Sequence, residues 1–295
     1  GETRRMSVHK KKPWSKKGRD GPWDAIVIGS GMGGMTTAAL LSELGHRVLV
    51  LEQHYVPGGF THVFKRKGWT WDVGVHAVGE VTEHSMTGRL LARLTRGRLQ
   101  WASLGPVYDQ FHYPDGFTIG FPDSPGQFRE ALVEAFPEEV EAIDRYLALV
   151  RETAAAMRGY YLSRALPSWL ARLTDRWLAG PAQPFFEQRT AEVVAGLTDN
   201  PQLRNLFTAQ WGYYGSVPSR SSFAIQALVV KHFMYGGFYP IGGAREIALH
   251  LLQTAASPGA IEAVPYRWGL EDYAQIRKTR GNILATGPRI TAKNR

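Results

Sequence analysis

The sequence predicts an α/β fold, in which a Rossmann-like domain with a parallel sheet is joined to an α+β substrate or cap domain. An apolar run at residues 25–28 leads into a glycine-rich turn at residues 29–34 and then into a helix-like stretch of alanine and leucine. A second apolar run at residues 47–51 ends at Glu52. Farther along, residues 107–121 alternate around a Pro-Asp-Gly turn, which indicates an antiparallel hairpin and hence a second domain.

Each glycine of the turn Gly29-x-Gly31-x-x-Gly34 has a physical reason. Gly29 permits the tight turn, Gly31 lets the backbone approach a pyrophosphate closely, and Gly34 lets the helix press against the strand. Glu52 follows Gly34 by eighteen residues, near the spacing of roughly 20 residues at which a carboxylate binds ribose hydroxyls. The pattern predicts an adenine dinucleotide site for NAD or FAD. A glycine turn of another α/β protein is the weaker alternative, because both flanks fit.

Motifs beyond Glu52 carry a resemblance to a known family. Glu52-x5-Gly58-Gly59 with Asp72-x-Gly74-x-His76 resembles the flavin amine oxidase and phytoene desaturase superfamily, particularly its all-trans-retinol 13,14-reductase and carotenoid isomerase branch. The likeness extends from about residue 23 to about residue 253 and includes a second glycine motif at residues 236–246. The predicted cofactor-binding residues are Gly29, Ser30, Gly31, Met32, Gly33, Gly34, Glu52, Gln53, Gly58 and Gly59.

The resemblance implies an oxidoreductase that uses FAD, with NAD(P)H as a candidate reductant, on a conjugated polyene such as a retinoid or carotenoid. Saturation, desaturation and isomerisation of the C=C bond all stay open. An NAD(P)-dependent dehydrogenase is the second interpretation, because the same βαβ unit binds both cofactors. No catalytic residue is assigned. Asp72 and His76 would face the same side of a strand, with a structural hydrogen bond as the favoured role of His76. No metal-ligand spacing is present.

The expected domain organisation follows the motifs. It comprises a basic flexible tail at 1–22, the first part of the dinucleotide-binding domain at 23–80, a substrate or cap domain at 81–235, a return to the first domain at 236–264 and an atypical tail at 265–295.

The tail after Pro265 departs from the resembled family. A small β-meander and a final strand of the sheet would be expected there, and residues 266–295 do not show their pattern. This departure predicts a C-terminally truncated member whose sheet is incomplete, so that the strand at residues 25–28 becomes an exposed apolar edge. An inactive, truncated dinucleotide-binding remnant is therefore the non-enzyme interpretation.

Composition and charge exclude several other classes. The formal net charge of +9 lies at the two ends of the chain, because residues 1–22 hold eight Lys and Arg against two acids and residues 264–295 hold seven against two. Without a nucleic-acid motif, these ends predict no nucleic-acid partner. The absence of cysteine excludes disulfides and thiolate metal sites. Residues 25–42 are uncharged, but their four glycines argue against a transmembrane helix.

Two aromatic stretches suggest contacts with apolar molecules. In residues 160–178 one helical stripe holds Leu166, Trp169, Leu170, Leu173 and Trp177, which suits a helix lying in a membrane interface; a helix packed on its own domain is the favoured alternative. Aromatic residues between 211 and 239 could line a slot for a flat substrate, although most are expected in the core. The expected location is the cytoplasm, peripheral to a membrane. The oligomeric state is left open.

Overall fold

The computed structural model describes residues 21–256, 264–265 and 282–285. The chain divides into two compact units, and each has its own core. The first unit comprises residues 1–77, 81–102 and 239–295, and the second comprises residues 78–80 and 103–238.

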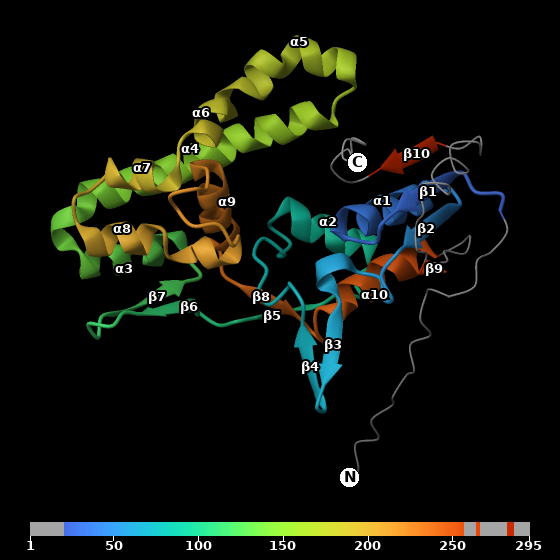
Figure 1. Cartoon of the computed structure of the whole chain (residues 1–295), viewed down its shortest axis with the longest axis horizontal. Helices are drawn as coiled ribbons and strands as arrows, with labels where there is room; N and C mark the ends of the chain where they lie inside the picture. Colours follow the sequence, from blue (N-terminus) through green and yellow to red (C-terminus); the bar gives the residue numbers. More distant parts are fainter. Residues whose placement is uncertain (1–20, 257–263, 266–281, 286–295) are drawn as a thin grey trace, which may run out of the picture. The chain divides into compact units, whose positions relative to one another are not determined.

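A four-stranded parallel sheet organises the first unit (Figure 1). Its strands are β1 (Ala25–Ile28), β2 (Val48–Glu52), β9 (Val264–Pro265) and β10 (Asn282–Ala285), in the order β10-β1-β2-β9. All residues of β1 pair in parallel with β2. Val27, Val48 and Val50 are fully buried, as expected where helices cover the face of a parallel sheet. The predicted strand, turn, helix and strand are confirmed.

The expectation that β1 would be an exposed edge is wrong. β10 pairs in parallel with the whole of β1, from Ala25 opposite Asn282 to Ile28 opposite Ala285. A four-residue strand is too short to show a periodicity, and its partner lies at the other end of the sequence. Residues 257–263 lie outside the described residues, as do nearly all of the two expected tails.

Helices of the first unit pack beside the sheet. They are α1 (Met32–Glu43), α2 (Met86–Leu94) and α10 (Arg245–Ala255). α1 packs on α10, and its residues Met35, Ala38 and Ala39 are fully buried. α2 begins after Ser85, whose hydroxyl accepts a hydrogen bond of 2.9 Å from the N–H of Gly88. This cap satisfies one of the otherwise free N–H groups of the first turn.

Short antiparallel pairs complete the first unit and lead into the second. β3 (Val63–Arg66) pairs with β4 (Trp69–Asp72) in a hairpin that extends as a narrow arm (Figure 1). β5 (Trp101–Ser103) pairs with β8 (Phe238–Pro240).

The second unit combines a hairpin with helices. The hairpin predicted around the Pro-Asp-Gly turn is confirmed as β6 (Val107–His112) and β7 (Thr118–Pro122). The helices are α3 (Pro125–Ala135), α4 (Val140–Ala165), α5 (Ser168–Leu178), α6 (Gln183–Glu187), α7 (Thr190–Ala195), α8 (Pro201–Phe207) and α9 (Phe223–Phe233). Apolar side chains from β7, α3, α4, α8 and α9 form one core.

A polar contact lies inside that core. Gln226 is fully buried and donates to the carbonyl of Phe207 at 2.8 Å, while the hydroxyl of Tyr146 donates to the same carbonyl at 2.7 Å. The rings of Tyr146 and Phe207 stack with centroids 4.0 Å apart. Because buried polar groups are costly unless they are paired, these bonds fix α4, α8 and α9 in one arrangement. In the described part of the chain, no helix is both long enough and apolar enough to cross a membrane.

Candidate functional site

The turn between β1 and α1 has the conformation that its first glycine allows. Gly29 has φ +92°, a region that side-chain-bearing residues rarely adopt, and its N–H donates to the carbonyl of Leu51 at 2.7 Å. A Cβ atom added at Gly29 would meet nothing within 4 Å, so the backbone angle and not the space requires glycine here.

Gly31 stands in front of open space. It is the N-cap of α1, with ordinary φ −66° and ψ 177°, and an added Cβ would meet no atom within 4 Å. The first turn of α1 contains no acidic residue and receives no side-chain cap. Its N–H groups and the positive end of the helix dipole are therefore available to an anion in that space.

Gly34 serves packing. A Cβ added there would lie 1.9 Å from the carbonyl oxygen of Gly29 and 3.4 Å from a methyl group of Val27. The first turn of the helix therefore presses directly on the loop and the strand. The three glycines meet three separate requirements: a backbone angle, an open approach and close packing, as expected from the sequence.

Glu52 ends β2 beside the turn and is held by the backbone around it. One carboxylate oxygen accepts the N–H of Ser30 at 2.8 Å and also the hydroxyl of Ser30, and the other accepts the N–H of His54 at 2.8 Å. Glu52 is buried, at 8% exposure. A carboxylate offers about four acceptor positions, and these bonds occupy three of them.

Ser30 joins the predicted motifs to one another. Its hydroxyl donates to Glu52 and accepts a hydrogen bond of 2.9 Å from the N–H of Gly58. Gly59, with φ +53°, lies against the turn so closely that its added Cβ would stand 2.9 Å from the Cα of Gly31. The spacing of the motifs gave no sign of this bridge, because the partners of Ser30 are 22 and 28 residues away in the sequence.

The structure thus brings most of the predicted cofactor-binding residues into one cluster. Gly29, Ser30, Gly31, Gly34, Glu52, Gly58 and Gly59 adjoin one another through the contacts above. Met32 and Gly33 are exposed in the first turn of α1, and Gln53 is exposed after Glu52. The set fits an adenine dinucleotide, since it pairs an uncapped helix N-terminus with a carboxylate.

Asp72 is linked to the second glycine motif. The hydroxyl of Tyr239 donates to its carboxylate at 2.5 Å. Burial and this bond raise the pKa of Tyr239, so the phenol stays protonated. The expectation that Asp72 and His76 share one face of a strand fails, because β4 ends at Asp72. Among the described residues no group of three His, Asp or Glu side chains could hold a metal ion.

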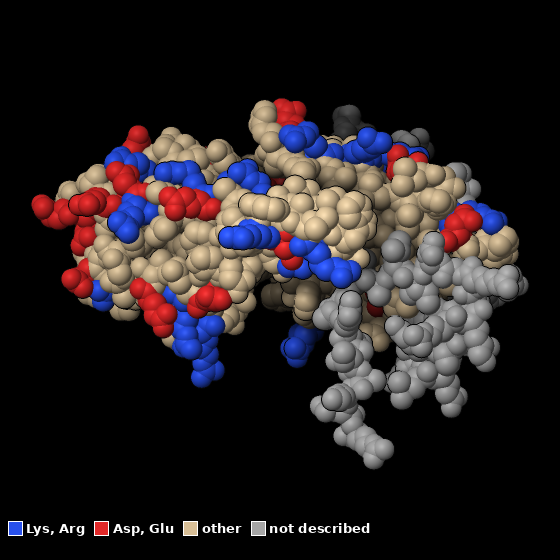
Figure 2. All heavy atoms as spheres, turned by 90° about the horizontal axis from the view of Figure 1, so that it is seen from above, with Lys and Arg blue, Asp and Glu red and all other residues tan. Residues whose placement is uncertain are grey.

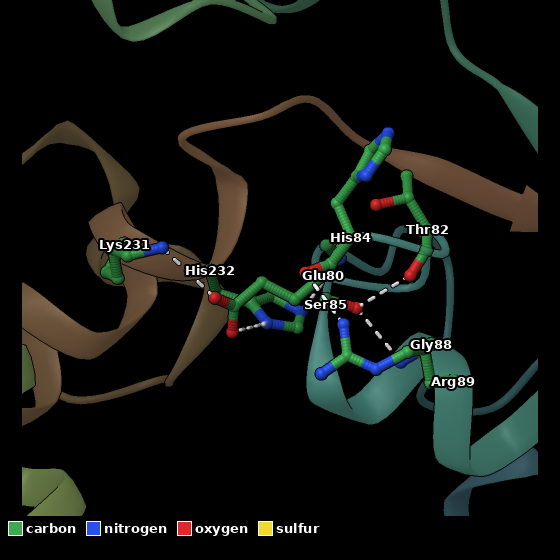
Figure 3. A network of polar contacts seen from close by, with 9 residues as sticks. Glu80, Thr82, His84, Ser85, Gly88, Arg89, Lys231 and His232 are labelled. Atoms are coloured by element: carbon green, nitrogen blue, oxygen red, sulfur yellow. Dashed lines mark hydrogen bonds and ion pairs between the residues drawn. The ribbon is translucent and has the colours of Figure 1, made fainter.

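A polar cluster in the second unit was not expected from the sequence (Figure 3). Glu80, at φ +50°, lies between Lys231, whose ammonium is 3.1 Å away, and the Nδ1 atom of His232 at 3.8 Å. The Nε2 atom of His232 accepts the N–H of Gly79 at 2.8 Å, which leaves Nδ1 to carry the ring proton toward Glu80. The bond to His232, with Lys231, holds the pKa of Glu80 below its ordinary value.

The aromatic residues between 211 and 239 have mixed roles. Phe223 and Phe233 belong to the buried core, and the hydroxyl of Tyr213 donates to Asp109 at 3.1 Å. Trp211 is 41% exposed and lines an open groove of about 400 Å³ in the second unit. The other lining residues are Phe111, His112, Tyr113, Asn205, Thr208, Ala209 and Pro218.

Comparisons with known proteins agree with this geometry. Residues 27–94 match the family model described as an NAD(P)-binding Rossmann-like domain. The chain is 36% identical over 249 residues to the all-trans-retinol 13,14-reductase of Danio rerio, an alignment that covers 80% of this chain and 40% of that protein. It is 28% identical over 249 residues to the chloroplastic prolycopene isomerase 2 of an Oncidium hybrid cultivar, with 81% and 42% covered.

A solved structure shares the fold. The cyclohexylamine oxidase from Brevibacterium oxydans IH-35A aligns with a TM-score of 0.56 at 20% identity, over 84% of this chain and 52% of that one. The parallel sheet and the turn after its first strand place the chain among dinucleotide-binding proteins of Rossmann-like fold. Within that class, the chain belongs to the flavin amine oxidase and phytoene desaturase superfamily. It spans less than half the length of the curated relatives it matches.

Proposed function

We propose that the chain is the dinucleotide-binding and cap part of an FAD-dependent oxidoreductase that acts on a conjugated polyene, a retinoid or a carotenoid. The observation that carries the proposal is the open space in front of Gly31, with the carboxylate of Glu52 beside it, in a chain of this superfamily. The substrate class is supported by two relatives, which are named for reduction of all-trans-retinol and isomerisation of prolycopene.

The residues divide the work of binding between them. The backbone of residues 29–34, with the N-terminus of α1, would hold the pyrophosphate, and Glu52 with Gln53 would bind the ribose hydroxyls. Gly58 and Gly59 would let the cofactor lie close to the loop after β2. Bound FAD would supply hydride transfer at its flavin ring, with NAD(P)H as the proposed reductant.

Three reactions of the C=C bond fit this assignment. Saturation, desaturation and isomerisation each need the polyene held in a dry slot beside the flavin. Saturation also needs a proton for the second carbon, and no side chain of the described residues is assigned to that step. Because polyenes partition into lipid, we also propose that the protein works in the cytoplasm at the surface of a membrane.

An NAD(P)-dependent dehydrogenase is the second candidate, and the description of the matching family model favours it. An absorption spectrum of the purified chain separates the two candidates. Visible flavin bands, with displacement of the bound cofactor by added FAD, support the proposal. A colourless, folded chain that binds NAD(P)H and not FAD refutes it.

Turnover tests the substrate. The chain is incubated with reduced flavin and all-trans-retinol, and the products are separated by chromatography. Conversion supports an active enzyme. A folded chain that binds FAD, yet converts neither retinol nor a carotenoid, instead supports the inactive dinucleotide-binding remnant.

A further inference from the structure

Helix α5 packs on α4 through one of its faces. Leu170, Thr174 and Leu178 are partly buried on this inner face. The fit is close, because a Cβ added at Gly159 of α4 would lie 2.4 Å from the carbonyl oxygen of Leu178. Asp175 also points inward, where its carboxylate accepts the hydroxyl of Ser163 in α4. The inner face alone therefore holds α5 in the second unit, and its other face makes no part of this packing.

The outer face of α5 exposes large apolar side chains. Trp169, Leu173 and Trp177 are 63%, 65% and 72% exposed. They are spaced by four residues, so they form one stripe along the helix. The sequence grouped Leu170 with this stripe, whereas the structure turns Leu170 inward and leaves the two tryptophans outside. Single exposed apolar residues are common on helices, whereas a contiguous exposed apolar stripe marks an interaction surface.

The charged side chains on the outer face of α5 have one sign. Arg172 and Arg176 are exposed on the same outer side of α5. The single acid of the helix, Asp175, is drawn to the inner side, where it also lies 3.7 Å from Arg164. In the view from above, the uncharged area over α5 has Lys and Arg side chains along its border, with acidic side chains among them (Figure 2). The outer face of α5 is thus both apolar and cationic.

We propose that the outer face of α5, formed by Trp169, Arg172, Leu173, Arg176 and Trp177, docks the protein on the surface of an anionic phospholipid bilayer. Tryptophan favours the boundary between headgroups and acyl chains, where its apolar ring and polar N–H are both accommodated. Arginine pairs with lipid phosphate while its aliphatic stem lies along apolar surface. A helix with an apolar stripe and basic flanks lies in the plane of such an interface.

This inference does not depend on the proposed function, because docking requires neither flavin nor substrate. Where the polyene assignment holds, docking gives the enzyme access to a substrate that is dissolved in the bilayer. The two ideas fail separately. A chain that binds vesicles but shows no flavin spectrum refutes the proposed FAD chemistry and leaves the docking intact. A chain that carries flavin but does not bind vesicles refutes the docking and the proposed membrane location, and leaves the FAD chemistry intact.

The test is cosedimentation of the full chain with vesicles. Vesicles of phosphatidylcholine and phosphatidylserine in equal parts should bind it at low salt, and vesicles of phosphatidylcholine alone should bind it weakly. The double variant R172Q/R176Q loses two cations worth about 1 kcal/mol each near the surface, so its apparent Kd should rise about 30-fold. The variant W169A/W177A should lose about tenfold in affinity for the vesicles per tryptophan, since each ring withdraws only part of its roughly 150 to 250 Å² from water.

A matched control tests whether vesicle binding depends on α5. Trp69 of β4 is 71% exposed and lies in the first unit, so W69A should bind vesicles like the unaltered chain. Circular dichroism and thermal unfolding should be unchanged in all variants, because every altered side chain is exposed. Equal loss in W69A overturns the assignment to α5. Absence of vesicle binding overturns the docking. If the chain binds no lipid, and light scattering shows a self-association that W169A/W177A removes, the outer face of α5 instead binds a second copy of the chain.

Discussion

Replacing Gly31 by alanine should separate cofactor binding from folding. The backbone at Gly31 has φ −66° and ψ 177°, which alanine adopts without strain, and the added methyl group meets no atom within 4 Å. The unfolded chain loses freedom on a glycine-to-alanine change, which stabilises a protein by about 0.4 to 1 kcal/mol. Alanine is a poorer N-cap than glycine, and this offsets the gain. The free energy of unfolding of the flavin-free protein should therefore change by less than about 1 kcal/mol.

Binding of the dinucleotide should respond quite differently. The methyl group would occupy the space in front of the first turn of α1, where the pyrophosphate is expected to approach the backbone N–H groups. Loss of one hydrogen bond to a charged group costs about 1.5 to 3 kcal/mol. This corresponds to a rise in the Kd for FAD of about 10- to 150-fold. Gly31→Val should be worse than Gly31→Ala, since it fills more of the same space.

The assay compares two quantities in the same protein. Urea unfolding of flavin-free material gives stability, and quenching of flavin fluorescence on titration gives the Kd. Gly126→Ala is the matched control, because Gly126 lies in the exposed first turn of α3 and an added Cβ there meets its nearest atom at 3.9 Å. This control should leave the Kd for FAD almost unchanged, and its free energy of unfolding should rise by about 0.4 to 1 kcal/mol, as expected for a glycine-to-alanine change at a compatible site. Unaltered FAD affinity in well-folded Gly31→Val would refute the reasoning, as would a large loss of stability in flavin-free Gly31→Ala.

Three further substitutions test neighbouring features. Ser30→Ala removes the acceptor of the buried Gly58 N–H, so urea unfolding should show a loss of about 1 to 3 kcal/mol; a loss below about 0.5 kcal/mol would contradict the bridging role. Gly34→Ala places a methyl group against a backbone carbonyl 1.9 Å away, so the melting temperature should fall sharply even without flavin, and an unchanged value would show that the helix can shift. The pKa of Glu80 is lowered from 4.5, mainly by its bond to His232, so the stability that its carboxylate contributes is complete above about pH 4.5 and is lost as the pH falls further. Glu80→Gln should therefore have a lower free energy of unfolding at neutral pH, and between about pH 5 and 3 its stability should change less with pH than that of the unaltered protein. Parallel curves of stability against pH for the two proteins would refute the linkage.

The local order of the first unit could be predicted from the sequence. Strand β1, the turn, helix α1, strand β2 and the terminal Glu52 depend on near neighbours in the chain: apolar periodicity, glycine geometry and the length of one βαβ unit. The hairpin of β6 and β7 depends on its own turn residues in the same way. The residues predicted to bind the cofactor from Gly29 to Gln53 followed from these signals, because they lie at the ends of predicted elements, whereas Gly58 and Gly59 followed from the resemblance to the family.

Tertiary structure decided what depends on residues far apart. The pairing of β10 with β1 joins opposite ends of the sequence through a strand too short to carry a pattern. The bonds of Ser30 to Glu52 and Gly58, and those of Glu80 to residues of α9, arise only after loops close over 22 or more positions. The sequence predicted that α5 is an amphipathic helix, but its packing on α4 determined which of its apolar residues are exposed to solvent. Periodicity describes one segment at a time, whereas burial depends on which surfaces the folded chain brings into contact.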